Sequence, residues 1–289
     1  MTASPPPTGS SQARHAATAP TFSAAPDALR ALLVLAREAA RDAGRVHRDG
    51  AREALHVETK STPTDLVSQI DREAERLIVE RIRERRPYDG ILAEEGALVK
   101  GTSGVRWVID PLDGTTNYVY GYPAYAVSIA VEIDDRVRVG VVYESSADRL
   151  FEAIEGYGAR GDGARLEVCA RTELPRALIA TGFSYEASQR RRQGEVIAGV
   201  LGRVRDIRRG GSAALDLCHV ASGHVDAYWE LGLAPWDYAA GALIAREAGA
   251  EVQVIEAPGW RGPAIVAAPQ PLFAELLALL NEVDAFARP

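Results

Sequence analysis

The chain has 289 residues, of which 47% are hydrophobic and 25% are charged. This composition is typical of a globular protein and excludes wholesale disorder and a fibrous repeat, while the length suits two domains or one large layered domain. No apolar run approaches the ~20 residues that cross a bilayer. The net charge of −7 argues against binding to nucleic acid or to a membrane surface.

The two cysteines and the few lysines limit the chemistry available to the chain. Cys169 and Cys218 cannot form a disulfide framework or a thiolate zinc site by themselves. We predict that both are buried small hydrophobic residues in a reducing cytosol, so that the protein is cytoplasmic. Lysine occurs only at Lys60 and Lys100, so a reaction that needs a lysine has two candidates.

The first part of the chain changes from a polar tail to two helices. Residues 1–26 are rich in Pro, Ser, Thr and Ala, and we predict a disordered N-terminal tail. Apolar residues then recur at helical spacing over residues 27–48. A second helix is predicted to be capped by Asp65, to place Leu66 and other apolar residues on one face, and to stop at Pro87.

The rest of the chain first favours strands and then alternates strands with helices. Strands are predicted at residues 91–93, 107–109, 125–133, 137–143 and 150–154, with tight turns at Asp134-Asp135 and Asp162-Gly163. Beyond about Arg171, strands are predicted at 177–180, 204–208, 225–229, 251–255 and 264–267, and helices at 187–201, 212–222, 237–248 and from 271 onward.

This order of elements predicts an α+β or α/β fold in which two mixed or antiparallel sheets lie between helix layers. We divide the chain into the tail, an N-terminal α+β subdomain over residues 27–170, and a C-terminal α/β subdomain over residues 171–289.

Two patterns resemble binding motifs without their context. Residues 156–161 match the G-x-G-x-x-G of dinucleotide-binding loops, but that motif requires a helix to begin inside it. The alternation over residues 166–170 predicts a strand instead, so we interpret the glycines as turn residues. The arginine-rich segments 190–192 and 203–209 lack interleaved aromatic residues, and we interpret them as solvated faces.

The most informative segment is WVIDPLDGTTN, residues 107–117. A buried strand ends at Asp110, and Asp113 follows three residues later. The Gly114 turn and the two threonines after it offer backbone N–H groups and hydroxyls that can hold an anion. Taken alone, however, a D-x-x-D-G segment fits a simple turn equally well.

Further acidic residues favour a site over a turn. Glu94 and Glu95 follow a short predicted strand, Asp237 begins a predicted helix, and Asp71 lies early in the second helix. Each also has a structural interpretation: Glu94 as a solvated loop charge, Asp237 as a helix N-cap, and Asp71 as a surface residue.

Convergence of Glu94, Asp110, Asp113 and Asp237 would require cations. Each pair of carboxylates at roughly 4 Å costs about 4 kcal/mol at an effective dielectric constant of about 20. Oxygen ligands without His or Cys select Mg²⁺ or Mn²⁺ over zinc. Several such ligands beside an anion cradle are what two-metal hydrolysis of a phosphate ester requires.

Three blocks of the sequence resemble the signature of the inositol monophosphatase family, which is a magnesium-dependent and lithium-sensitive phosphatase family. They are DPLDGTTN at residues 110–117, the Glu94-Glu95 pair, and WDYAAGALIAREAGA at residues 236–250. The resemblance extends from about Val57 to Ala268. It implies an αβαβα sandwich, a phosphatase activity and a homodimer.

The resemblance also implies a set of metal ligands. Glu94, Asp110 and the carbonyl of Leu112 would hold a first Mg²⁺, and Asp110, Asp113 and Asp237 would hold a second. A third and weaker Mg²⁺ would use Glu94 and water. The family often has glycine before the glutamate pair, whereas this chain has Ala93. Alanine is tolerated there unless the backbone needs a positive φ.

Catalytic and substrate-binding roles are likewise implied by the resemblance. Thr115, hydrogen-bonded to Asp71, would orient the attacking water, with Glu95 in support. Lys60 matches a loop lysine near the third metal, and the amides of Gly114 and Thr115 would hold the phosphate. The residues that would face the alcohol part of the substrate are Asp113, Ala213, Glu230 and Asp237.

The sequence therefore predicts Mg²⁺-dependent hydrolysis of a small phosphate monoester, by in-line attack of a metal-activated water. The default substrate is myo-inositol 1-phosphate, and histidinol phosphate, fructose 1,6-bisphosphate and adenosine 3′,5′-bisphosphate are alternatives within the family.

Two alternative functions lie outside this activity. A haloacid-dehalogenase-like phosphatase is disfavoured because its aspartates lie two apart and it needs a lysine downstream, where this chain has none after Lys100. The second alternative is a non-catalytic regulatory protein that retains the fold.

Overall fold

The computed structural model describes residues 25–51, 57–60, 66–171 and 173–289. The predicted tail lies outside these ranges except for its last two residues, and Pro26 already begins the first helix. The predicted cap at Asp65 is also outside them. Within the described residues, none of the helices combines the length and the apolar character that a bilayer crossing needs.

Within the described residues the structure contains two large sheets and one short two-stranded sheet. The first comprises β3 (Gly90–Ala93), β4 (Leu98–Val99), β5 (Val105–Asp113), β6 (Ala126–Ile133), β7 (Arg136–Glu144), β8 (Arg149–Ile154), β9 (Ala159–Gly161) and β10 (Ala164–Arg165), in the order β10-β9-β8-β7-β6-β5-β3-β4. The second comprises β11 (Leu178–Thr181), β12 (Asp206–Arg208), β13 (Ala227–Leu231), β14 (Glu251–Ile255) and β15 (Ala264–Ala268), in the order β12-β11-β13-β15-β14.

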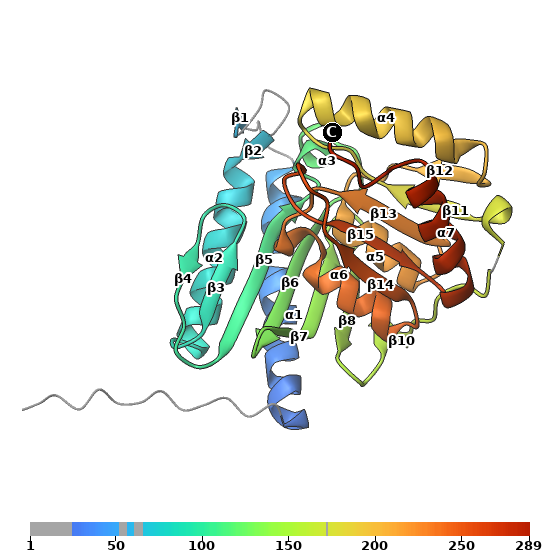
Figure 1. Ribbon diagram of the computed structural model, residues 1–289. Coiled ribbons are helices and arrows are strands. Elements are labelled where there is room, and N and C mark those ends of the chain that lie inside the picture. Colours follow the sequence, from blue (N-terminus) through green and yellow to red (C-terminus); the bar gives the residue numbers. More distant parts are fainter. Residues whose placement is uncertain (1–24, 52–56, 61–65, 172) are drawn as a thin grey trace, which may run out of the picture.

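Three layers of helices enclose these sheets (Figure 1). The outer layer on the first sheet is α1 (Pro26–Gly50) with α2 (Gln69–Arg85), the central layer is α5 (Ala213–Ala221) with α6 (Pro235–Glu247), and the outer layer on the second sheet is α4 (Ala187–Leu201) with α7 (Gln270–Glu282). Short elements complete the fold: β1 (Val57–Thr59), β2 (Leu66–Ser68), α3 (Thr115–Val119) and a 3₁₀ turn at Leu174–Arg176. The expected αβαβα sandwich is confirmed.

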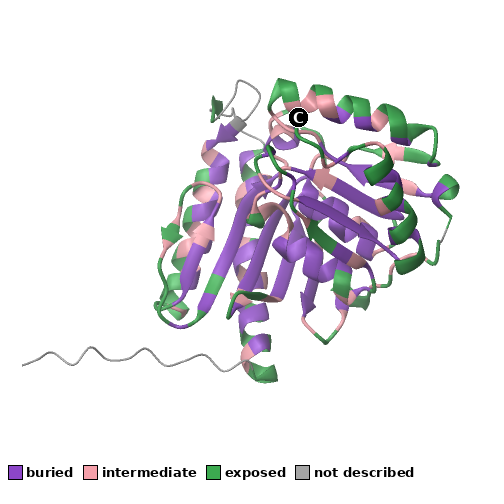
Figure 2. Cartoon of the chain, viewed as in Figure 1, coloured by how far each residue is buried: buried purple, intermediate pink, exposed green. Residues whose placement is uncertain are grey.

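Burial on both faces of the first sheet follows from the two-residue period of its strands. In β5, Trp107 and Ile109 pack with α1 and α2, whereas Val108 between them packs with α5 and α6. A strand covered on both faces has no polar side, which explains the apolar run from Trp107 to Ile109 in the middle of β5. Figure 2 shows the same pattern, with buried strands in the middle and exposed residues on the outer helices.

The pairing of β3 with β5 positions the two acidic segments. These strands run parallel, with Leu92 opposite Val108 and Ala93 opposite Ile109. The next residue after β3, Glu94, therefore lies beside Asp110 of β5, and the Glu94 amide donates to the carbonyl of Ile109 at 3.1 Å. Ala93 is not among the described residues with a positive φ, so alanine fits where the family often has glycine.

The start of the second helix differs from the prediction. Leu66 lies in β2 and pairs with Thr59, so it is not a helical residue. Ser68 caps α2: its hydroxyl accepts from the amide of Ile70, and the carboxylate of Asp71 accepts from the amide of Ser68. A Ser/Asp capping pair satisfies two amides and fixes the helix start there, which is why the helix begins after Leu66.

Other predictions were met in part. The Asp134-Asp135 turn joins β6 to β7 with φ values of 51° and 59°, as predicted for a hairpin. Residues 166–170 do not form a strand, because the amides of Leu166 and Val168 donate to two unrelated segments. Cys218 is buried as predicted, whereas Cys169 is only half-buried and its thiol donates to Asp226 at 2.9 Å.

His47 on α1 is a fully buried histidine. Its Nδ1 lies 2.9 Å from the hydroxyl of Ser145, and its ring lies beside those of Tyr118 and Tyr125. Burial lowers the pKa of His47 to about 3, against the opposing effect of a carbonyl at Pro111, and the charge of Arg48 lowers it further. The native protein thus keeps this ring neutral.

We expect His47 to make the protein less stable in acid. In the unfolded chain the pKa of histidine is about 6.5, so between about pH 6.5 and pH 3 the unfolded state binds a proton that the native state does not. The contribution of His47 to the free energy of unfolding is therefore largest above about pH 6.5, and it falls by a few kcal/mol as the pH drops to about 3. Urea unfolding of wild type and His47→Asn at several pH values measures it. A free-energy difference between them that does not change with pH would contradict this expectation.

Candidate functional site

A cavity of about 550 Å³ opens where the ends of β5 and β13 meet the starts of α3 and α6. Most residues that the sequence placed at the site line it: Lys60, Glu94, Asp110, Leu112, Asp113, Gly114, Thr115, Glu230 and Asp237. Three expected residues do not. Asp71 and Glu95 contact the lining from behind, and Ala213 is buried in the core at the first turn of α5.

The other side of the cavity was not predicted from the sequence. This side consists of Phe183, Ser184, Tyr185, Glu186 and Gln189, with Leu231, Gly232, Leu233, Trp236 and Arg261. They come from the segment before α4 and the first turn of α4, from the end of β13 through to the start of α6, and from the loop before β15. Of these, Trp236 stood in a recognised block, and the rest carry no local sequence signal.

Each aspartate of the cavity is held by one of its two carboxylate oxygens. Oδ1 of Asp110 accepts from the amide of Leu112 at 3.0 Å. Oδ2 of Asp113 accepts from the Ser212 hydroxyl at 2.6 Å and from the Ala214 amide at 2.8 Å. Because these two donors lie at the N-terminus of α5, the helix dipole also favours the negative charge.

Asp237 is fixed at the start of α6 in a similar way. Its Oδ2 accepts from the amide of Ala234 at 2.7 Å, so it serves as the third residue of the helix, and Ala234 is the N-cap. The interpretation of Asp237 as an N-cap is therefore wrong. Asp71 and Glu94 also differ from their structural interpretations, since Asp71 is buried and Glu94 is ion-paired within the cavity.

Burial and mutual repulsion make these carboxylates hard to ionise. Desolvation, followed by the charges of Glu94, Asp113 and Asp237, raises the pKa of Asp110 well above its usual value. Desolvation also raises the pKa of Asp237, and it raises that of Asp113 to about 7, with Glu94 adding to both. Such groups ionise together only when positive charge is nearby.

Lys60 supplies positive charge to this cluster. Its Nζ lies 2.9 Å from Oε1 of Glu94 and 2.6 Å from Oε1 of Glu95. Burial alone lowers the pKa of Lys60, but these two carboxylates outweigh it and the net shift is upward. The pKa of Glu95 is raised to about 7, chiefly by burial and in spite of Lys60.

The donor set of the cavity suits a hard divalent cation, although the side chains are not yet gathered around one. As they stand, no three His, Cys, Asp or Glu residues in the described ranges are arranged to hold a metal ion. Glu94 is paired with Lys60, while the hydrogen bonds above use only one oxygen of each aspartate. The second oxygens and the carbonyl of Leu112 are oxygen donors of the kind that Mg²⁺ prefers.

Thr115 stands between the cavity and the buried Asp71. Its hydroxyl lies 2.8 Å from Oδ1 of Asp71 and 3.0 Å from the carbonyl of Leu112. A hydroxyl has one proton, so donation to Asp71 leaves the Leu112 carbonyl with its lone pairs. The hydroxyl and amide of Ser68 hold the other oxygen of Asp71.

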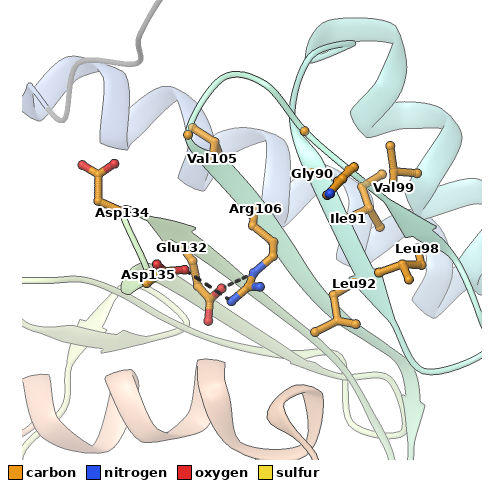
Figure 3. Close-up of a pocket in the computed structure, with 13 residues that line it drawn as sticks. Gly90, Ile91, Leu92, Leu98, Val99, Val105, Arg106, Glu132, Asp134 and Asp135 are labelled. Carbon is orange, nitrogen blue, oxygen red and sulfur yellow. Dashed lines mark hydrogen bonds and ion pairs between the residues drawn. The ribbon is translucent and has the colours of Figure 1, made fainter.

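Two other candidate places are unlike this cavity. A cavity of about 630 Å³ lies at the edge of the first sheet (Figure 3). There Arg106 is paired with Glu132 at 2.6 Å, and apolar side chains form much of the wall.

In the glycine-rich loop, the amides of Gly156 and Gly158 both donate to Glu247 at 2.7 Å. The chain's own carboxylate thus occupies those amides, and their interpretation as turn residues is confirmed.

Comparison with known proteins identifies the family. The model of the inositol monophosphatase family matches residues 28–283, and the chain belongs to this family. Inositol-1-monophosphatase SuhB from Mycobacterium tuberculosis is 47% identical over 239 residues, which cover 79% of this chain and 82% of that protein. Nus factor SuhB from Vibrio cholerae is 44% identical over 224 residues, covering 76% and 84%. The crystal structure of extragenic suppressor protein SuhB from Bartonella henselae has a TM-score of 0.81 at 38% identity, covering 86% and 98%.

Gly114 is a position at which only glycine fits. Its φ is +93°, and an added Cβ would lie 2.8 Å from the carbonyl oxygen of Ala124. Gly121 has a φ of +69° but open space around it. The two positions therefore separate the effect of backbone conformation from that of steric overlap.

We expect Gly114→Ala to destabilise the protein more than Gly121→Ala. Gly121→Ala should cost about 1–2 kcal/mol for its left-handed backbone, and Gly114→Ala should add about 1–3 kcal/mol because the new methyl group meets fixed backbone. Urea unfolding of both variants measures the difference. Equal losses would show that the loop moves freely away from Ala124.

Proposed function

We propose that the protein hydrolyses a small phosphate monoester with the help of Mg²⁺, and that the ester is myo-inositol 1-phosphate. The observation that carries this proposal is the meeting of Glu94, Asp110, Asp113 and Asp237 in one cavity beside the Gly114 turn. Family membership and the name of the Mycobacterium tuberculosis relative agree with it.

The carboxylates would hold the metal ions. Glu94, Asp110 and the Leu112 carbonyl would hold one Mg²⁺, and Asp110, Asp113 and Asp237 a second, with a third at Glu94 and Mn²⁺ as an alternative. Bound Mg²⁺ supplies a water of lowered pKa and screens the charge that develops on the phosphate and the leaving oxygen. Glu94 would have to leave Lys60 in order to take part.

The remaining residues position the ester and the water. Thr115, whose hydroxyl donates to Asp71, would accept a hydrogen bond from the attacking water, with Glu95 and Lys60 behind it. The amides of Gly114 and Thr115 would donate hydrogen bonds to phosphate oxygens, because a glycine at position 114 lets the backbone come close to the phosphate. No side chain has to form a covalent intermediate.

The alcohol side of the substrate would lie against Asp113, Glu230 and Asp237, and also against Ala213 if the wall shifts. The pKa of Glu230 is raised to about 7, chiefly by burial, while the Tyr228 hydroxyl donates to it at 2.9 Å. A carboxylate held in this position can accept a hydrogen bond from a substrate hydroxyl. Histidinol phosphate and fructose 1,6-bisphosphate are the alternative substrates, and we propose a cytoplasmic homodimer.

A regulatory role is the second candidate function. The observation that favours it is the name of the Vibrio cholerae relative, Nus factor SuhB. Such a role would not need turnover. Failure of the purified full-length chain to hydrolyse any small phosphate ester with Mg²⁺ would favour it over the phosphatase.

We expect Asp110→Asn to abolish turnover without unfolding the protein. The amide keeps the size of the side chain but removes the charge needed by both metal sets, so the rate should fall by about 100-fold or more. The measurement is phosphate release from a panel of esters with Mg²⁺, with and without lithium, alongside circular dichroism. Asp135→Asn is the control, since its side chain is 96% exposed in a hairpin turn. Unchanged rates in Asp110→Asn would remove Asp110 from the mechanism.

Removal of the metal should affect the stability of wild type and that of Asp110→Asn differently. In EDTA, Asp110→Asn should be at least as stable as wild type, because one of several repelling charges is gone. Mg²⁺ at about 100 times its dissociation constant should stabilise wild type by about 2.7 kcal/mol and the variant much less. Thermal unfolding with EDTA and with Mg²⁺ tests this. An equal gain in both would mean that the ion binds elsewhere.

A further inference from the structure

Arg261 is a cation that the site described so far does not use. It lines the same cavity as the carboxylates, from the loop between β14 and β15. The residue is exposed, and within the described ranges the structure gives it no hydrogen bond or ion pair. Lys60, the other cation of the lining, is already paired with Glu94 and Glu95.

The backbone on both sides of Arg261 is fixed. Trp260 is buried, and its indole N–H donates to the carbonyl of Ala287 at 2.9 Å. Gly262 packs so closely that an added Cβ would lie 2.1 Å from the carbonyl oxygen of Leu233. Hydrogen bonds from the amides of Gly232 and Leu233 to the carbonyl of Pro263 tie the loop to the β13–α6 connection. A guanidinium on a rigid loop is well suited to binding, because little of the backbone has to be ordered.

The charges of the cavity indicate what this guanidinium can bind. Six carboxylates line the cavity: Glu94, Asp110, Asp113, Glu186, Glu230 and Asp237. An anionic group on the substrate would be repelled throughout such a lining except beside bound metal or beside a free cation. The metal ligands lie at the ends of β3 and β5 and at the start of α6, whereas Arg261 lies against Gly232 on the wall that carries Glu230.

We infer that Arg261 binds a second anionic group of the substrate, remote from the phosphate that is hydrolysed. The substrate class is then a small phosphate monoester that also carries a second phosphate or a carboxylate. Arginine binds either group through two parallel hydrogen bonds. This inference rests on the proposed phosphatase activity but departs from its default ester, because myo-inositol 1-phosphate has no second anionic group. Among the substrates proposed above it favours fructose 1,6-bisphosphate.

Two matched pairs of esters test the inference. Fructose 1,6-bisphosphate and fructose 1-phosphate differ only in the distal phosphate. In the second pair, 2-phosphoglycerate has a carboxylate where glycerol 2-phosphate has a hydroxymethyl group. Wild type should prefer the member with the second anion in at least one pair. The pair that shows the preference identifies the anion as phosphate or carboxylate.

Arg261→Gln should remove that preference. We expect kcat/KM for the dianionic member to fall by about 10- to 100-fold, the usual effect of a hydrogen bond to a charged group, with the loss in KM. The partner ester should change less than about twofold, and Arg261→Lys should restore part of the preference. Arg83→Gln, on the exposed face of α2, is the control and should change neither ester.

Binding without turnover separates this inference from the proposed function. Isothermal titration of the full chain with the same esters, with Ca²⁺ in place of Mg²⁺, gives affinities that do not depend on catalysis. A preference that depends on Arg261 would support the inference even if no ester were hydrolysed, in which case only the proposed function fails. Equal affinity of wild type for both members of both pairs, or an equal loss for both in Arg261→Gln, would overturn it.

Discussion

Repulsion among buried carboxylates is the constraint around which the rest of the structure is arranged. Asp110, Asp113 and Asp237 each have a raised pKa, with burial as the largest cause and with neighbouring acids raising it further. A chain tolerates such a cluster only where hydrogen bonds and cations offset it. The amides at the starts of α5 and α6 supply the first, and Lys60 supplies part of the second.

The fold was predictable where burial alone decides the structure. The apolar run of β5 and the apolar face of α1 reflect the layers that enclose each element, so that the pattern in the sequence is the pattern in space. The start of α2 was not predictable in this way. Leu66 fits the apolar spacing of a helix, but the Ser68–Asp71 capping pair fixes the start two residues later. Strand β4, at Leu98–Val99, is too short to produce a period at all.

The site was predictable chiefly where its residues stand in recognisable blocks, such as the Glu94-Glu95 pair, DPLDGTTN and the block that begins at Trp236. Asp110, Asp113, Gly114 and Thr115 stand in one block, so a single segment indicates their chemistry. Arg261 lies far along the chain from that block and sits in a loop without any motif, and only the packing of Gly262 against Leu233 brings it to the cavity. Residues that reach a site through tertiary contacts leave no signal in local spacing.

The parallel pair β3–β5 lies within a sheet whose other neighbouring strands are antiparallel. Its register in the hydrophobic core fixes the position of Glu94 relative to Asp110. Ile91 and Leu92 point to opposite helix layers, so a slip of one residue would exchange their environments. The same slip would shift Glu94 relative to Asp110. Hydrophobic packing of these two strands therefore keeps the two acids aligned, although it contacts neither carboxylate.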